Sequence, residues 1–227
     1  MSEVADNINF IRERIRVAAE RAGRNPEEIA LIAVSKTVEP DRIEAALVAG
    51  QALFGESKVQ EARAKIPLVS GRASWHMIGH LQTNKAREAV ALFEVIHSVD
   101  SVKLAVEIEK CAERAGKTQA ILLEVNVSGQ ASKFGLKSED LKSAVAEINR
   151  LPRLEVRGLM TIAPFIEETQ KARPWFRRLR ELRDTLGLRE LSMGMTHDFE
   201  AAIEEGATMV RIGTAIFGGR KRYEPAE

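Results

Sequence analysis

The spacing of apolar residues changes along the chain, from a helical period near the N-terminus to short apolar runs further on. Val4, Ile8 and Ile11 lie three or four residues apart, which is the period of one face of a helix. Gly23 is a residue type that commonly follows the last helical turn. The pattern predicts an N-terminal helix over about residues 3–23.

The first continuous apolar run, residues 29–36, is too short for a core helix and is typical of a strand buried on both faces. A segment with a leading proline and a closing glycine, residues 40–50, predicts a helix, and residues 52–55 predict a second strand. Later apolar runs predict six further strands, with helical patterns between them. They cover residues 75–79, 95–99, 119–127, 154–162, 191–195 and 208–213.

Eight strands that alternate with helices favour a parallel sheet with right-handed crossovers, and closure into a barrel suits that number of strands. We therefore predict an α/β fold, a single (β/α)8 TIM-type barrel, with an open doubly wound sheet as the competing architecture. A barrel of this kind can be one unit from ~200 residues upward, so residues 1–227 are expected to form one domain. The polar end of the chain, about residues 219–227, is expected to be loose.

Composition and charge exclude several classes of function. The 34 Lys and Arg residues nearly balance the 33 Asp and Glu residues, so the broad positive field that nucleic-acid binding uses is missing. The N-terminus lacks a signal-peptide pattern and no segment approaches the ~20 apolar residues that cross a bilayer. We expect a cytoplasmic protein that binds neither nucleic acid nor membrane.

The residues that commonly bind metals are sparse. Cys111 is the single cysteine and is expected to be a small buried hydrophobe, so no intrachain disulfide and no cysteine-based zinc cluster can form. His76 and His80 are four residues apart, which along a strand is ~13 Å and too far to share one ion. We expect no metal site.

A lone amine stands at the end of the first predicted strand. Lys36 follows the apolar run directly, and in an α/β barrel the C-terminal ends of the strands form the functional face. Desolvation at such a position favours the neutral amine that imine formation requires. The plainer interpretation is a lysine whose stem covers the strand end while its charge reaches water.

Two turns near the C-terminus contain glycines and hydroxyls. Ser192, Met193 and Gly194 lie at the end of the seventh strand before a helix, and Gly213 and Thr214 end the eighth. Each turn alone could be an ordinary cap or loop. Because the loops after strands seven and eight form the usual phosphate site of barrels, the two turns together favour a phosphate ligand.

Other side chains are expected near the same mouth. Arg211 precedes Gly213 by two residues, so strand alternation puts it on the face that the glycine leaves open, where it could bind a ring nitrogen or a carboxylate, or pair with an internal acid. An arginine facing a pyridine nitrogen disfavours protonation of the ring, which makes the ring a weaker electron sink. Asn126, Met160 and His80, at or near the ends of other strands, are further candidates for the lining.

Several segments together closely resemble the pyridoxal phosphate homeostasis proteins, the YggS/PROSC-type family, whose fold is similar to the N-terminal barrel of alanine racemase. They are AVSK (33–36), GESKVQE (55–61), WHMIGHLQTNK (75–85), HSVDS (97–101), EVNVSGQASKFGL (124–136), GLMTIAP (158–164), LSMGMTHDFEAAIEEG (191–206) and VRIGTAIFG (210–218). The resemblance implies that Lys36 binds pyridoxal 5′-phosphate as a Schiff base. It also implies that Ser192, Gly213 and Thr214 hold the phosphate and that Arg211 faces the pyridine nitrogen.

The family is described as one that binds, carries or buffers the cofactor, so the resemblance implies intracellular cofactor homeostasis without defined catalysis. Ser57 and Lys58 stand where the family usually shows Asn and then often Arg or Tyr, which puts a contact of that loop to the cofactor in question. Apo forms of pyridoxal phosphate enzymes are the partners that this role implies, and a monomer is expected.

Two other functions remain open. The first is a pyridoxal phosphate enzyme of the racemase type, although the second domain that supplies the racemase tyrosine has no counterpart and Tyr223 is the single tyrosine. The second is a barrel that binds another phosphorylated metabolite without a Schiff base.

Overall fold

The structure, a computed structural model, describes residues 2–130, 132–164 and 166–219. Within them, eight parallel strands form one closed barrel in which each strand pairs with the next and β8 pairs with β1. The predicted (β/α)8 barrel is confirmed, and the open doubly wound sheet is excluded. The strands are β1 (Ala30–Val34), β2 (Leu53–Glu56), β3 (Ser74–Met77), β4 (Val95–Val99), β5 (Gln119–Glu124), β6 (Leu154–Met160), β7 (Glu190–Met195) and β8 (Met209–Ile212).

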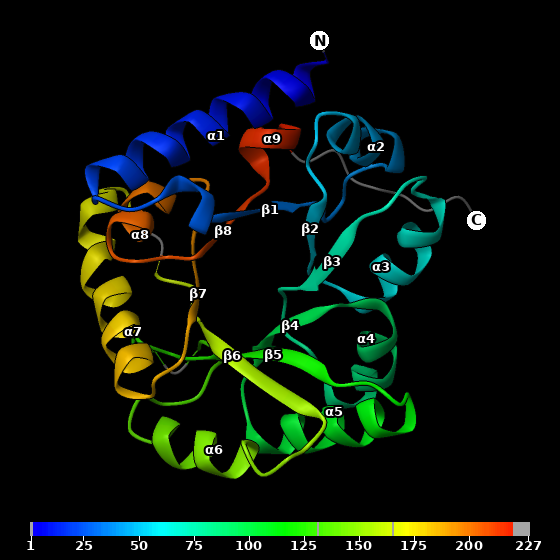
Figure 1. The fold of residues 1–227 in the computed structure, drawn as a ribbon, viewed down its shortest axis with the longest axis vertical. Coiled ribbons are helices and arrows are strands. Elements are labelled where there is room, and N and C mark those ends of the chain that lie inside the picture. The colour runs from blue at the N-terminus through cyan, green and yellow to red at the C-terminus, as the bar shows by residue number, and fades with distance from the viewer. Residues whose placement is uncertain (1, 131, 165, 220–227) are drawn as a thin grey trace.

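Helices surround the strands as an outer ring (Figure 1). The helices are α1 (Glu3–Arg21), α2 (Pro40–Val48), α3 (Val59–Lys65), α4 (Ala86–Leu92), α5 (Val102–Arg114), α6 (Leu141–Ile148), α7 (Arg173–Thr185), α8 (Phe199–Glu204) and the one-turn α9 (Thr214–Phe217). Short 3-10 turns occupy Pro26–Glu28, Ile66–Leu68, Thr83–Lys85 and Thr169–Ala172. None of the helices in the described ranges combines the length and apolar composition that a membrane crossing needs.

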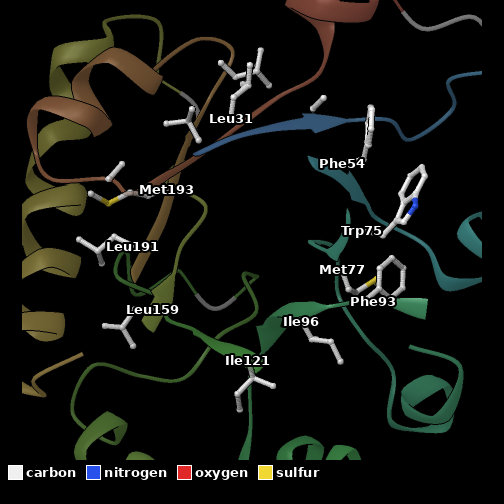
Figure 2. Close-up of a cluster of buried hydrophobic side chains, with 14 of the residues drawn as sticks. Leu31, Phe54, Trp75, Met77, Phe93, Ile96, Ile121, Leu159, Leu191 and Met193 are labelled. Carbon is white, nitrogen blue, oxygen red and sulfur yellow. The ribbon is translucent and has the colours of Figure 1, made fainter. Parts of the chain in front are cut away.

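Alternation along the strands divides the buried side chains into two layers. Outward-facing residues such as Phe54, Trp75 and Ile121 pack between strands and helices, as Figure 2 shows. A smaller inner cluster contains Ile32 and Leu122 and fills part of the barrel interior. Other inward positions hold buried polar side chains, among them His76, His97, Ser192 and Arg211.

Several strands end earlier than their apolar runs predict, β5 and β6 among them. The run over residues 119–127 gives a strand only as far as Glu124, and the run over 154–162 only as far as Met160. Beyond Glu124 the backbone turns, because the Val127 N–H donates to the carbonyl of Val125, 3.1 Å away. The Thr161 hydroxyl donates to that same carbonyl at 2.8 Å, so β-branched residues here stabilise a bend instead of a ladder.

The N-terminal helix joins the first and last parts of the barrel. Ser2 caps α1, since its hydroxyl accepts the N–H of Ala5. The apolar face of α1 packs against α8, α9 and α2. Asn7 Nδ2 donates to the carbonyl of Ile216 in α9 at 3.0 Å. From residue 220 onward, the polar tail expected at about 219–227 lies outside the described residues.

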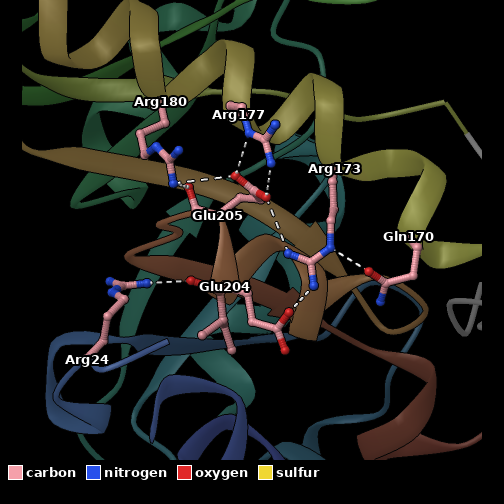
Figure 3. A network of polar contacts seen from close by, with 8 residues as sticks. Arg24, Gln170, Arg173, Arg177, Arg180, Glu204 and Glu205 are labelled. Atoms are coloured by element: carbon pink, nitrogen blue, oxygen red, sulfur yellow. Dashed lines mark hydrogen bonds and ion pairs between the residues drawn. The ribbon is translucent and has the colours of Figure 1, made fainter. Parts of the chain in front are cut away.

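An ion-pair network fixes α8 and the turn after it against α7 (Figure 3). Glu205, whose side chain is 5% exposed, forms ion pairs with Arg173, Arg177 and Arg180 at 3.0–3.4 Å, and Arg173 also pairs with Glu204. Several charges on one buried carboxylate stabilise more than isolated surface pairs do. The network therefore holds the end of α8 and the turn that leads from it toward β8.

Candidate functional site

A cavity of about 840 Å³ opens where β1, β2, β3, β7 and β8 end, on the face that carries the active sites of α/β barrels. Its volume is in the range of small-molecule sites. Five of the residues predicted from the sequence line it: Lys36, Ser57, Arg211, Gly213 and Thr214. The structure thus brings together side chains from both ends of the sequence.

Lys36 lies two residues beyond the end of β1, in a four-residue turn that the Val38 N–H closes by donating to the Ser35 carbonyl at 3.0 Å. The lysine side chain lines the cavity and is exposed. Thr37, the next residue, has a φ of 60°, a left-handed conformation that is unusual for a β-branched residue.

Hydroxyl groups and a glycine turn form the part of the cavity wall that follows β7 and β8. Thr196 follows β7, and Thr214 begins α9, so its first N–H groups have no partner within that helix. Gly213 lines the cavity beside β1, where a Cβ would lie 3.2 Å from both the Cβ and the carbonyl oxygen of Val34. The close approach of β8 to β1 leaves little room for a larger residue.

Arg211 extends from β8 into the barrel interior and is 4% exposed. Its Nη2 donates to the Thr161 carbonyl at 2.8 Å and its Nη1 to Ser192 Oγ at 2.5 Å. Burial lowers the pKa of Arg211 to about 10, although Asp198 and Glu124 act against the shift. The guanidinium remains charged at neutral pH and is held in one direction.

A line of hydrogen bonds continues from Arg211 along the barrel interior. Ser192 Oγ lies 2.9 Å from His97 Nδ1, and His97 Nε2 lies 2.9 Å from His76 Nδ1. Burial lowers the pKa of His76 to about 4 and that of His97 well below its usual value. Both imidazoles are neutral at physiological pH, so they orient Ser192 and Arg211 without adding charge.

Three residues predicted for the phosphate turn do not line the cavity. Ser192 faces inward and is fully buried, and its hydroxyl is already bonded to Arg211 and His97. Met193 faces outward into the layer under the helices (Figure 2). Gly194 has a φ of 89°, and a Cβ there would lie 2.6 Å from the Cβ of Ala202, so this glycine lets α8 pack closely.

Three further candidates also lie away from the cavity. Met160 belongs to the inner apolar cluster. His80 stacks on Phe134 with ring centroids 3.8 Å apart, and its Nδ1 lies 3.3 Å from Asp100 Oδ2. Asn126 lines a separate cavity of about 160 Å³, where its amide donates to the Gln130 carbonyl at 2.8 Å.

Thr196 and Arg42 line the cavity but were not among the predicted site residues. Thr196 directly follows the last residue of β7, so the signal for it is a hydroxyl immediately beyond the strand end. Arg42 comes from the first turn of α2, and sequence spacing gives no indication that this helix reaches the barrel mouth.

Glu124 is a buried carboxyl group on the inner face of β5 and lines the smaller cavity. Burial, and to a smaller extent the charge of Asp100, raise the pKa of Glu124 to about 7, although Arg211 and Lys133 act against the shift. The folded protein therefore binds this proton more tightly than the unfolded chain does. As pH rises from the unfolded value through about 7, folding loses free energy.

Replacing Glu124 with Gln should remove that loss, because an amide has no proton to release. Relative to wild type, the free energy of unfolding of the variant should rise by ~2–3 kcal/mol between about pH 5 and about pH 8. Urea unfolding at several pH values measures this difference. Glu139→Gln, at an exposed carboxylate, is the control. If the free energy of unfolding depends on pH in the same way in wild type and in Glu124→Gln, the raised pKa is not that of Glu124.

Residues 7–221 match the family described as "Alanine racemase, N-terminal domain". A pyridoxal phosphate homeostasis protein of Aquifex aeolicus is 45% identical, covering 95% of this chain and 98% of its own, and one of Pseudomonas aeruginosa is 44% identical over 100% of both chains. The structure of PipY of Synechococcus elongatus with PLP bound has a TM-score of 0.84 and 35% identity, and covers 95% of this chain and 100% of that chain.

Proposed function

Because the chain belongs to the pyridoxal phosphate homeostasis protein family, we propose that it holds pyridoxal 5′-phosphate in the 840 Å³ cavity, as a Schiff base on Lys36. One observation carries the proposal. The cavity brings the Lys36 amine, the hydroxyls of Thr196 and Thr214 and the Arg211 guanidinium to one site.

The residues present suit the groups of this cofactor. Hydroxyls and the free N–H groups at the start of α9 are donors for a phosphate, and Gly213 leaves the backbone accessible there. We assign the phosphate to Thr196, Gly213 and Thr214. Ser192, for which the family resemblance implied the same contact, instead fixes Arg211 by accepting its N–H.

Arg211 is assigned to the pyridine nitrogen. A charged guanidinium can only donate hydrogen bonds, so it favours an unprotonated ring nitrogen. The bound cofactor supplies an aldehyde carbon for covalent attachment and a ring that can accept electrons. With the ring nitrogen unprotonated, the ring accepts electrons weakly, which suits storage of the cofactor better than turnover of amino acids.

The covalent step is balanced by loss of water. The Lys36 nitrogen adds to the aldehyde carbon, a C=N bond replaces the C=O bond, and the two amine hydrogens leave with the oxygen as one water molecule. The step consumes no oxidant or reductant and is reversed by water, so attachment and release need no further reagent. A carrier requires this property.

The test uses the wild-type protein and stoichiometric pyridoxal 5′-phosphate. We expect an imine absorbance band in the visible range, and borohydride reduction followed by peptide mapping should put the label on Lys36. Label on another lysine would move the site, and a protein without the band would favour the barrel that binds a different phosphorylated metabolite. A racemase would show itself by turnover of alanine enantiomers, which we do not expect.

We further propose that the protein acts in the cytoplasm as a monomer and passes the cofactor to apo enzymes that require it. The exposed position of Lys36 supports release to a partner, since the amine is accessible to solvent. Transfer to an apo enzyme can be followed by recovery of that enzyme's activity, with a trap for free pyridoxal 5′-phosphate in solution. No recovery in the presence of the trap would contradict direct transfer.

A further inference from the structure

A largely buried ion cluster, in which only Glu61 is partly exposed, at 14%, lies beneath the turn that carries Lys36. Lys65, the last residue of α3, and Glu56, the last residue of β2, both have side chains that are 0% exposed, and Glu61 is one helical turn before Lys65. We propose that Lys65, Glu61 and Glu56 are positioning residues that fix the backbone direction of Lys36. This inference rests on the function proposed for Lys36.

The cluster holds the two peptide groups on either side of Lys36. Lys65 Nζ donates to the carbonyl of Ser35 at 2.7 Å, and that carbonyl belongs to the peptide group preceding Lys36. The N–H of Thr37, in the peptide group following Lys36, donates to Glu61 Oε1 at 2.5 Å. Because the peptide groups are planar, their orientations set φ and ψ of Lys36, and hence the direction in which its side chain leaves the chain.

The two anchors are joined to each other. Lys65 Nζ lies 2.6 Å from Glu61 Oε1 and 3.0 Å from Glu56 Oε1, so with the Ser35 carbonyl all three of its N–H donors are used. Ser35 Oγ donates to the same Glu56 oxygen at 2.7 Å. A displacement of one anchor therefore requires a displacement of the other.

The left-handed residue in the turn explains why such an anchor is needed. In a four-residue turn, a positive φ at the third position is normally supplied by glycine, and Thr37 occupies that position. A β-branched residue in this conformation is strained, because its Cβ crowds the backbone. The Glu61 hydrogen bond to the Thr37 N–H offsets this strain and holds the turn in the conformation that directs Lys36 to the cavity.

Burial of charge alone does not account for the arrangement. The free-energy cost of removing two ions from water offsets much of their mutual attraction. A buried ion pair therefore adds little net stability compared with apolar residues of the same size. What the cluster does provide is one defined geometry at the residue that the proposed function uses. Glu61→Ala is the informative variant, because Lys65 keeps Glu56 as its counter-ion and no buried charge is left alone.

We expect Glu61→Ala to raise the dissociation constant for pyridoxal 5′-phosphate by about 10-fold, which corresponds to ~1.4 kcal/mol. Glu61→Gln keeps an oxygen that can accept from Thr37, so its affinity should stay within about 3-fold of wild type. Hydrogen exchange of the Thr37 amide in cofactor-free protein is the second readout. It should be at least about tenfold faster in Glu61→Ala than in Glu61→Gln, if the anchor is lost locally.

A double-mutant cycle separates positioning from general destabilisation. In a Thr37→Gly background the turn adopts its conformation without help, so Glu61→Ala should then change the dissociation constant by about 2-fold or less. An equal effect of Glu61→Ala in both backgrounds would overturn the proposal. So would wild-type affinity in Glu61→Ala.

The two proposals fail in different ways. If wild-type protein forms no imine, the proposed function is wrong, whereas the exchange of the Thr37 amide still reports whether the anchor exists. If wild type binds the cofactor on Lys36 and Glu61→Ala binds it equally well, the function stands and the positioning role is wrong.

Discussion

Lys36→Ala should abolish the imine absorbance completely and weaken binding of pyridoxal 5′-phosphate by about 100-fold or more, equivalent to ~2.8 kcal/mol. Alanine cannot form the covalent link, and the contacts that remain are those of Thr196, Thr214 and Arg211. Absorbance titration and equilibrium dialysis measure the two losses.

The fold should survive this substitution, because Lys36 is exposed and substitutions at exposed positions usually change stability by less than about 0.5 kcal/mol. Lys58→Ala is the matched control, since Lys58 is also exposed and follows the next strand but does not line the cavity. Retained absorbance in Lys36→Ala, or a comparable loss in Lys58→Ala, would refute the assignment of the attachment site.

Gly158→Ala should have the largest effect on folding. A Cβ at residue 158 would lie 2.0 Å from the carbonyl oxygen of Glu190 and 2.5 Å from its carbonyl carbon. Those atoms are backbone of β7, paired with Gly158 in the barrel, so no side chain can rotate out of the way. Overpacking usually costs 1–3 kcal/mol, and we expect about 3 kcal/mol or more here, because two strands must separate.

Urea unfolding monitored by circular dichroism measures the loss of unfolding free energy. In a thermal melt the expected fall in Tm is about 10 °C for a chain of this length. Gly219→Ala serves as the control, since a Cβ there meets nothing within 4 Å and its φ is not in the left-handed region. Equal stability of the two variants would show that β6 and β7 can move apart freely.

The strands were predictable because each is a short apolar run, and in a closed barrel surrounded by helices such runs are buried on both faces. Strand ends were less predictable. Val125 and Thr161 are residue types that favour strands, but their hydrogen bonds here belong to a bend in the backbone. Apolar character decides burial, whereas the last ladder hydrogen bond depends on the neighbouring strand.

Lys36, Ser57, Arg211, Gly213 and Thr214 were found from the sequence because they lie at or just after strand ends. Ser192 was also predicted to hold the phosphate but does not line the cavity, whereas Thr196, which was not predicted, does. Both are small hydroxyl residues near the end of β7, and the depth at which the barrel interior closes decides which one reaches the cavity. Ser192 lies below that depth, where its hydroxyl contacts Arg211 of the neighbouring strand β8 and His97 of β4.

The ion cluster of Lys65, Glu61 and Glu56 could not be predicted from the sequence for a different reason. A lysine at the end of a short helix is normally solvated, and the spacing of Glu61 and Lys65 predicts an ordinary surface pair four residues apart. Burial follows only when Glu56 and Ser35 arrive from neighbouring strands of the barrel. The contribution of α3 to the site is therefore a tertiary property.

The packing of α1 has a consequence for synthesis on the ribosome. Its apolar face, with Val4, Ile8, Ile11 and Ile15, is covered by α8, α9 and α2, and two of these helices are translated last. At 5–20 residues per second the nascent helix waits roughly 10–40 s for these partners. During that interval the face is exposed, which makes the growing chain a substrate for chaperones that recognise apolar helices, and completion of β8 and α9 ends the exposure.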